Sequence, residues 1–196
     1  MRQRWRALLW RWLAHAATLT AGQRLALAAW LRVWRLSPQD PVALATLAFL
    51  RGQAGRYRGA LAWQRRRVRL TPACADAQFN LGFILAELQQ PLAAAEAFGA
   101  AVALRPGLDR AWYGLGRVLW RLGRADEALQ ALERCATLQP WSPAAYEAMA
   151  RIHAEAGRKD AAVALVRRLE GFDPRAAARI EAACLGETAA GREAVA

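Results

Sequence analysis

Prolines recur in this chain at a constant interval, and no other feature limits its possible folds as strongly. Neighbouring members of the series are separated by 34 residues. The series consists of Pro38, Pro72, Pro106, Pro140 and Pro174. A fixed period of this length is typical of architectures in which each repeat is one supersecondary unit. The sequence therefore predicts one array of similar units.

Each unit contains two apolar-periodic segments of about a dozen residues, which indicate two helices joined by a short break. The units begin at Ala7, Pro41, Ala75, Asp109 and Pro143. Most breaks contain glycine, which readily adopts the positive φ found at helix C-termini. We expect an all-α chain of about five antiparallel helix hairpins in a single domain over residues 1–186. A capping helix over about 176–185 and a frayed tail over 187–196 complete the prediction.

Small residues recur at the same step within the units. One series lies in the first helices and another in the second helices; they are Ala48, Gly82, Gly116 and Ala150, and Ala60, Ala94, Ala128 and Ala162. This recurrence indicates that two helices approach closely there. A larger side chain at such a position would overpack the contact, at a cost of about 1–3 kcal/mol.

The pattern resembles the tetratricopeptide repeat over residues 7–176. The unit that begins at Asp109 carries most of the signature, with Trp112, Leu115, Gly116, Gly123, Ala128, Leu132 and Pro140. The resemblance implies a right-handed superhelical solenoid whose first helices line a concave, protein-binding groove. It also implies a scaffold without catalytic activity, and a repeat fold by itself does not identify a partner.

Carrying the groove onto this chain gives a mixed aromatic and arginine lining. The predicted residues are Phe49, Phe79, Asn80, Phe83, Arg110, Tyr113, Arg117, Trp120, Arg121 and Arg151. Such a surface suits an acidic peptide with apolar anchors, because arginines pair with carboxylates and rings bury area. The alternatives are packing between helices for the rings and a solvated rim for the arginines. Some family members clamp a C-terminal carboxylate, but only Asn80 and Arg110 match that set.

The formal net charge is +12, which favours acidic proteins, anionic lipid or nucleic acid as partners. The unit from residue 41 contains seven arginines and no acid. Arg65, Arg66 and Arg69 are expected to point outward, either as a solvated face or as a docking patch for an anionic partner. Arg67 is expected near a helix interface, and we predict that it lies close to Asp76.

The first unit contains five of the nine tryptophans. On a helical wheel, one stripe of its first helix consists of Trp5, Leu8, Leu9, Trp12, Leu13 and Ala16. The stripe either packs on the helix over residues 24–35 or forms a docking face for lipid or a hydrophobic partner. Trp5 and Trp12 exceed what a repeat requires. The apolar first unit could also pair with itself in a homodimer.

No combination of residues indicates catalysis, a metal site or a cofactor. His15 and His153 lie in different units, and the three cysteines have no paired spacing, which favours a reducing compartment. No apolar run reaches the length of about 18 residues that indicates a membrane span. The arginine-rich, alanine-rich composition indicates a GC-rich bacterial genome. We expect no enzymatic activity and no cofactor.

The sequence therefore favours a cytoplasmic, non-catalytic adaptor or assembly factor that binds a protein or peptide. The alternative is a scaffold that attaches peripherally to an anionic membrane through its first two units. Nucleic acid is the less favoured partner of this basic surface.

Overall fold

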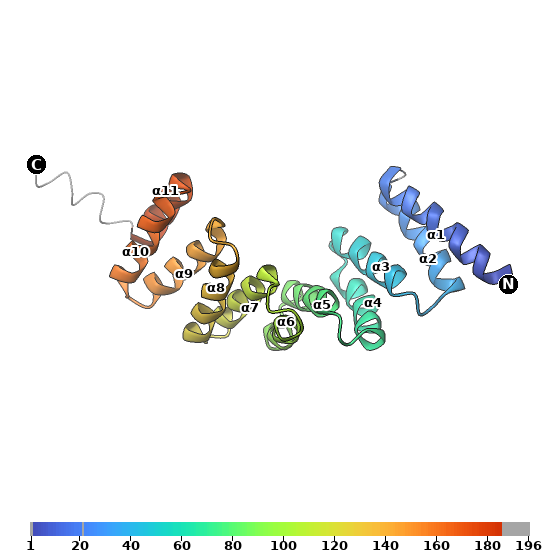
Figure 1. Ribbon diagram of the computed structural model, residues 1–196, viewed down its shortest axis with the longest axis horizontal. Coiled ribbons are helices and arrows are strands. Elements are labelled where there is room, and N and C mark those ends of the chain that lie inside the picture. The colour runs from blue at the N-terminus through green and yellow to red at the C-terminus, as the bar shows by residue number, and fades with distance from the viewer. Residues whose placement is uncertain (1, 21, 186–196) are drawn as a thin grey trace, which may run out of the picture. The chain divides into compact units, whose positions relative to one another are not determined.

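The computed structural model describes residues 2–20 and 22–185, and every regular element in these ranges is an α-helix (Figure 1). The all-α prediction is therefore confirmed. In chain order the helices are α1 (Arg2–Thr20), α2 (Gly22–Leu36), α3 (Pro41–Gln53), α4 (Tyr57–Leu70), α5 (Ala75–Glu87), α6 (Pro91–Leu104), α7 (Asp109–Arg121), α8 (Ala125–Leu138), α9 (Pro143–Glu155), α10 (Lys159–Glu170) and α11 (Pro174–Leu185). No described helix is long and apolar enough to span a membrane.

Consecutive helices pack in pairs: α1 on α2, α3 on α4, α5 on α6, α7 on α8 and α9 on α10. A residue with a positive φ lies at the break between the helices of each pair. Glycine occupies four of these positions, as the breaks in the sequence predicted, whereas Gln89 adopts φ 56° between α5 and α6. The hairpins therefore share one turn geometry even where the residue is unfavourable for it.

Two of the small residues show why the period is needed. A Cβ built on Gly82 would lie 2.8 Å from the Phe98 ring, and one on Gly116 would lie 2.7 Å from Leu132 Cγ. The partner is 16 residues further along in both hairpins. The close approach predicted between paired helices is therefore confirmed at both positions.

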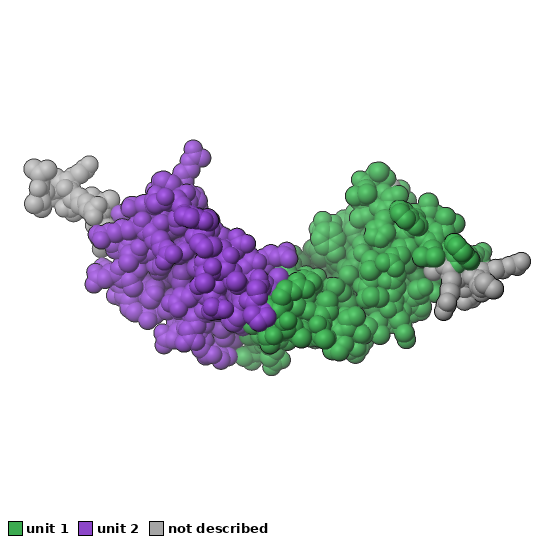
Figure 2. Space-filling model, in the orientation of Figure 1, with its two compact units in different colours: residues 1–105 green, residues 106–196 purple. Residues whose placement is uncertain are grey.

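The chain divides into two compact units, unit 1 over residues 1–105 and unit 2 over residues 106–196 (Figure 2). A core cluster of unit 1 surrounds Trp30, with Ala14, Val33 and Leu47 fully buried beside it. The larger core cluster of unit 2 extends from Leu119 to Ile180. The single domain predicted over residues 1–186 stays a prediction.

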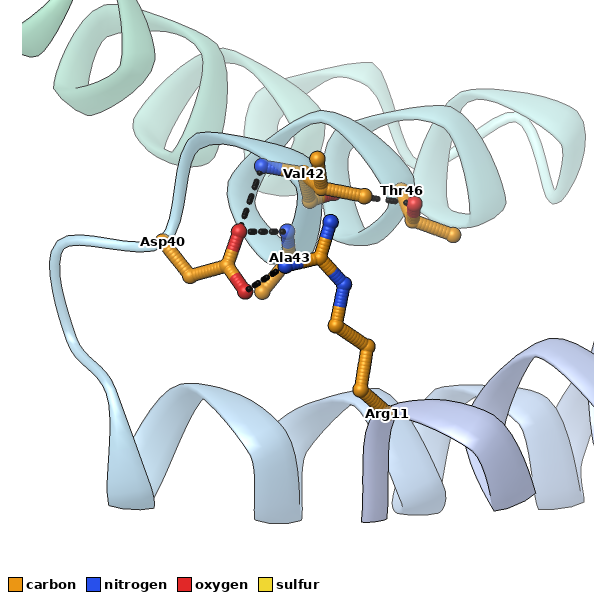
Figure 3. A network of polar contacts seen from close by, with 5 residues as sticks. All are labelled: Arg11, Asp40, Val42, Ala43 and Thr46. Carbon is orange, nitrogen blue, oxygen red and sulfur yellow. Dashed lines mark hydrogen bonds and ion pairs between the residues drawn. The ribbon is translucent and has the colours of Figure 1, made fainter. Parts of the chain in front are cut away.

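Side chains stabilise the start of α3. Asp40 Oδ1 accepts hydrogen bonds from the backbone N–H groups of Val42, at 2.8 Å, and Ala43, at 3.3 Å. Its other oxygen lies 3.4 Å from Nη1 of Arg11 on α1, so the same carboxylate links two hairpins (Figure 3). A carboxylate at this position also interacts favourably with the helix dipole.

Candidate functional site

A pocket of about 280 Å³ lies within unit 1, among α3, α4 and α5. Phe49, Tyr57 and Phe83 contribute rings to its lining, and Asn80 and Gln53 contribute amides; we call it the aromatic pocket. Phe49 is 57% exposed and Phe83 is 48% exposed, although the residues beside them in the core are buried. Three of the predicted groove residues, Phe49, Asn80 and Phe83, are thus brought together.

The repeat period places the two phenylalanines at equivalent positions. Phe83 follows Phe49 by one period, on α5 and α3 respectively. The Tyr57 ring packs edge-to-face on Phe83, with ring centres 6.4 Å apart. Gln64 at the wall is almost fully buried, and its Nε2 donates a hydrogen bond of 2.7 Å to the carbonyl oxygen of Ala77. The wall is therefore held by core contacts while the two phenylalanines remain available to a ligand.

In unit 2, the same repeat position carries arginine: Arg117 on α7 and Arg151 on α9, both exposed. Together with the exposed Arg121 on α7 they form what we call the arginine face. The guanidinium carbon of Arg117 lies 5.7 Å from the centre of the Tyr113 ring, which orients the group. None of the three arginines forms an ion pair with a carboxylate among the described residues.

Three other predicted groove residues take part in interactions with other residues of the chain. Trp120 Nε1 donates a hydrogen bond of 2.9 Å to Glu155 on α9. Phe79 lies against Phe98, with ring centres 5.9 Å apart. Arg110 is exposed on the first turn of α7 and takes part in a further interaction. The structure thus gives Phe79 and Trp120 packing or hydrogen-bonding roles, while their predicted ligand contacts stay predictions.

The basic run on α4 is divided between solvent and the interior. Arg65 and Arg69 are exposed, whereas Arg66 lies over the Trp34 ring, 5.7 Å from its centre. Arg67 Nη2 lies 3.8 Å from Cys74 Sγ. The carboxylate that the sequence assigned to Arg67, that of Asp76, forms two hydrogen bonds of 3.0 and 2.8 Å with Arg105, and its proximity to Arg67 stays a prediction. Arg105 follows Asp76 by 29 residues, a separation that no local pattern indicates.

The tryptophan stripe of α1 does not pack on α2. Trp5 is 72% exposed and Trp12 is 77% exposed, and the leucines between them are exposed as well. The residues that face α2 are Ala14, which is fully buried, and Trp10, which is partly buried against the core cluster. The packing interpretation of the stripe is therefore wrong, because Trp10 and Ala14 occupy that contact.

A second cavity, of about 660 Å³, lies in unit 2 among α8, α9 and α10. Its lining includes Tyr146, His153 and Arg168, and the Arg168 guanidinium lies 5.1 Å from the centre of the Tyr146 ring. Tyr146 Oη and His153 Nδ1 are buried without a hydrogen-bond partner among the described residues. The sequence did not predict this cavity. Its small wall residues, such as Ala136, have the same spacing as core alanines, so no local signal distinguishes them.

The pKa values of two side chains of unit 2, Cys135 and His153, are shifted from their ordinary values. Burial raises the pKa of the Cys135 thiol to about 11, so this cysteine behaves as the small hydrophobic residue that the sequence suggested. Burial, followed by the charge of Arg158, lowers the pKa of His153. No group of three His, Cys, Asp or Glu residues in the described ranges is placed to hold a metal ion.

Comparison with known proteins gives matches in family and fold. The model of the tetratricopeptide repeat family matches residues 109–152. No curated protein matches the sequence. A crystal structure of MamA protein is 22% identical, covers 86% of this chain and 92% of its own, and superposes with a TM-score of 0.81. MamA from Desulfovibrio magneticus RS-1 is 19% identical, with 86% and 95% covered and a TM-score of 0.81.

YrrB, described as a tetratricopeptide repeat protein with an unusual peptide-binding site, is 20% identical to this chain. The alignment covers 86% of this chain and 88% of YrrB, with a TM-score of 0.76. At these identities the similarity establishes the fold. The resemblance predicted from the sequence is thereby confirmed: residues 109–152 form a tetratricopeptide repeat segment, and the chain has the helical repeat fold of the tetratricopeptide repeat proteins.

Proposed function

We propose that this chain is a non-catalytic adaptor that binds a protein or peptide through the aromatic pocket of unit 1 and the arginine face of unit 2. One observation carries the proposal. At a single repeat position the chain presents Phe49 and Phe83, then Arg117 and Arg151, and all four side chains are exposed. None of the four side chains is buried in the core, so core packing does not require a ring or a guanidinium group at these positions. Binding of a ligand explains these residue types better than the fold does.

The chemistry of these side chains defines the partner. The aromatic pocket offers half-exposed rings that gain buried area when an apolar side chain enters, and its amides can hydrogen-bond a peptide backbone. The guanidinium groups of the arginine face form no ion pair with a carboxylate in the described part of the chain, so they can form charge-assisted hydrogen bonds with acidic side chains of a partner. The partner we propose is therefore an acidic segment with apolar anchors.

The comparisons support the class of function. Tetratricopeptide repeats are predominantly protein-binding modules, and YrrB, of similar fold, is described as having a peptide-binding site. By this analogy we propose that the chain acts as a scaffold or an assembly factor. The partner itself is argued from the two surfaces above, because fold similarity alone does not transfer a ligand.

Selection from a displayed library of random peptides, followed by fluorescence anisotropy on the strongest binder, tests the proposal. We expect selected peptides to combine Asp or Glu with a large apolar residue. Changing Phe49→Ala together with Phe83→Ala should weaken binding by at least about tenfold, since each truncation removes a buried ring from the contact. Leu92→Ala, at an exposed leucine of α6, is the matched control and should leave binding unchanged.

The arginine face is tested separately with Arg117→Glu and Arg121→Glu combined. This variant should also lose at least about tenfold in affinity, with a dependence on salt that the phenylalanine variant lacks. Arg167→Glu combined with Arg175→Glu changes the net charge equally at exposed positions of α10 and α11, and it should bind normally. If both charge variants lose the same affinity, the loss is an effect of net charge. If Arg117→Glu with Arg121→Glu binds normally, the arginine face has no role in binding.

A further inference from the structure

The outward face of α1 is a continuous apolar surface. Trp5, Leu8, Leu9, Trp12 and Leu13 are all exposed, and their spacing of three and four residues places them on one side of the helix. We call these five residues the outward stripe. Five large apolar side chains on one exposed helix face form a surface of a kind that usually marks an interaction site.

Repeat packing does not explain this surface. The side of α1 that faces α2 is formed by Trp10, Ala14 and Thr18, whose Oγ1 accepts a hydrogen bond of 2.9 Å from Trp30 Nε1 on α2; these residues lie on the opposite side of the helix. α1 packs on α2, and a helix face that a repeat array leaves uncovered is expected to be polar. In α1 the largest apolar side chains occupy that face instead.

The charge around the stripe has one sign. Residues 1–75 contain 14 arginines and a single carboxylate, that of Asp40. This carboxylate is already engaged by the start of α3 and by Arg11 (Figure 3). In the same hairpin, Arg6 on α1 and Arg24, Arg32 and Arg35 on α2 are exposed, and the Arg32 guanidinium lies over the Trp10 ring, 5.5 Å from its centre. The hairpin therefore combines an apolar face with cations that have no acidic partner nearby in sequence.

We propose that the α1–α2 hairpin docks on an anionic phospholipid surface, with the outward stripe in the interface between headgroups and acyl chains. An amphipathic helix with tryptophan and leucine on one face and arginine around it has the composition of helices that lie in that interface. Anionic headgroups supply the charge that residues 1–75 lack, and each arginine near the surface adds to the attraction. This site is distinct from the aromatic pocket and the arginine face, and it does not depend on their function.

Sedimentation of the full chain with vesicles tests this inference. We expect binding to vesicles of phosphatidylglycerol and little binding to vesicles of phosphatidylcholine, with affinity falling as salt rises. Trp5→Gln combined with Trp12→Gln should weaken binding by more than about tenfold, because two large aromatic side chains no longer enter the interface. Arg6→Gln should weaken it by about fivefold.

Trp141→Gln is the matched control, since Trp141 in unit 2 is 77% exposed, as Trp12 is. This variant should bind phosphatidylglycerol vesicles as the unchanged chain does. Circular dichroism should show the same helix content in all variants, because the replaced side chains lie outside the core. If the tryptophan pair and Trp141→Gln lose the same affinity, the outward stripe is not the docking site.

Two other occupants of the stripe would give different results. A second copy of the chain would produce a dimer in analytical ultracentrifugation that Trp5→Gln with Trp12→Gln dissociates, without binding to vesicles. A nucleic acid would produce binding to a single-stranded oligonucleotide that the same variant abolishes, again without vesicle binding. Either result would overturn the proposal.

Discussion

The first and last described helices, α1 of unit 1 and α11 of unit 2, turn opposite kinds of surface outward. α11 buries Ala176, Ala177 and Ile180 against its unit and exposes Arg175 and Arg179. Among the α1 side chains that the structure describes, Ala14 alone is buried, and two tryptophans are exposed. Since an uncovered helix face in a repeat array is stabilised by polar side chains, the outer face of α11 has the expected composition and that of α1 does not. The difference indicates that the outer face of α1 is selected for something other than closing its unit.

The same contrast extends along the repeats. The position that carries phenylalanine on α3 and α5 in unit 1 carries arginine on α7 and α9 in unit 2. The net charge is distributed the other way. The excess of arginine lies in residues 1–75, whereas residues 76–196 contain 14 basic and 15 acidic side chains. Two units with the same fold therefore present different chemistry, and that chemistry lies at positions that packing leaves free.

The largest effect that separates the two ends is expected from a buried charge. Ile180→Asp should lower the free energy of unfolding by more than about 4 kcal/mol, because it removes a buried side chain and places a carboxylate in the core. Leu9→Asp, on the outward stripe, should change it by less than about 0.5 kcal/mol. Urea unfolding followed by circular dichroism measures both, and equal effects would contradict the description of α1 as an uncovered helix.

Core packing of the two units can be compared at equivalent glycines. Gly116→Ala should destabilise by about 2–3 kcal/mol, because its Cβ would meet both Leu132 Cγ and, at 3.1 Å, the backbone oxygen of Ala128. Gly82→Ala should cost less, about 1–2 kcal/mol, because only the Phe98 ring must move. Chemical denaturation gives both values.

The control for these glycines is Gly99→Ala on α6, where an added Cβ meets no heavy atom within 4 Å. It should stabilise the chain by about 0.5–1 kcal/mol, because alanine loses less conformational entropy in a helix. A destabilising Gly99→Ala would mean that the losses at Gly82 and Gly116 do not report close packing.

Packing explains what the sequence could predict and what it could not. The period, the turn glycines and the close approach at Gly82 and Gly116 follow from residues that must recur for hairpins to stack. The exposed stripe was ambiguous because α1 is apolar on two sides, so a helical wheel shows a stripe without showing which side faces α2. The pairing of Asp76 with Arg105 and the cavity at Tyr146 depend on side chains brought together by the fold, and no spacing in the sequence encodes them.

The turns of the two units offer a smaller test. Gln89 in unit 1 adopts the positive φ that Gly123 adopts in unit 2. Gln89→Gly should therefore stabilise the chain by about 0.5–1 kcal/mol, since the relief of backbone strain exceeds the added flexibility of the unfolded chain. Gly123→Ala should destabilise it by about 1 kcal/mol. Thermal unfolding detects both, and a destabilising Gln89→Gly would show that the glutamine side chain contributes more than its backbone costs.

The smallest expected effect is a dependence on pH in unit 2. The folded state lowers the pKa of His153 below its ordinary value of 6.5, mainly through burial and then through Arg158, while Glu133 and Asp126 partly oppose the shift. The unfolded chain therefore binds the proton more readily than the folded chain. Stability attributable to His153 is complete above a pH of about 6.5 and is lost as the pH falls through that value towards the lower, folded pKa.

His153→Asn removes this titration but keeps a polar side chain beside Tyr146 in the cavity. Urea unfolding at about pH 7.5 and about pH 5.5 should give a smaller difference in stability for the variant than for the unchanged chain. The carboxylates contribute equally in both proteins. Subtracting the change in unfolding free energy of the variant from that of the unchanged chain therefore gives the contribution of His153. An identical pH dependence in the two proteins would mean that His153 takes up its proton in the folded state as easily as in the unfolded one, and the unpartnered Nδ1 would then be open to water.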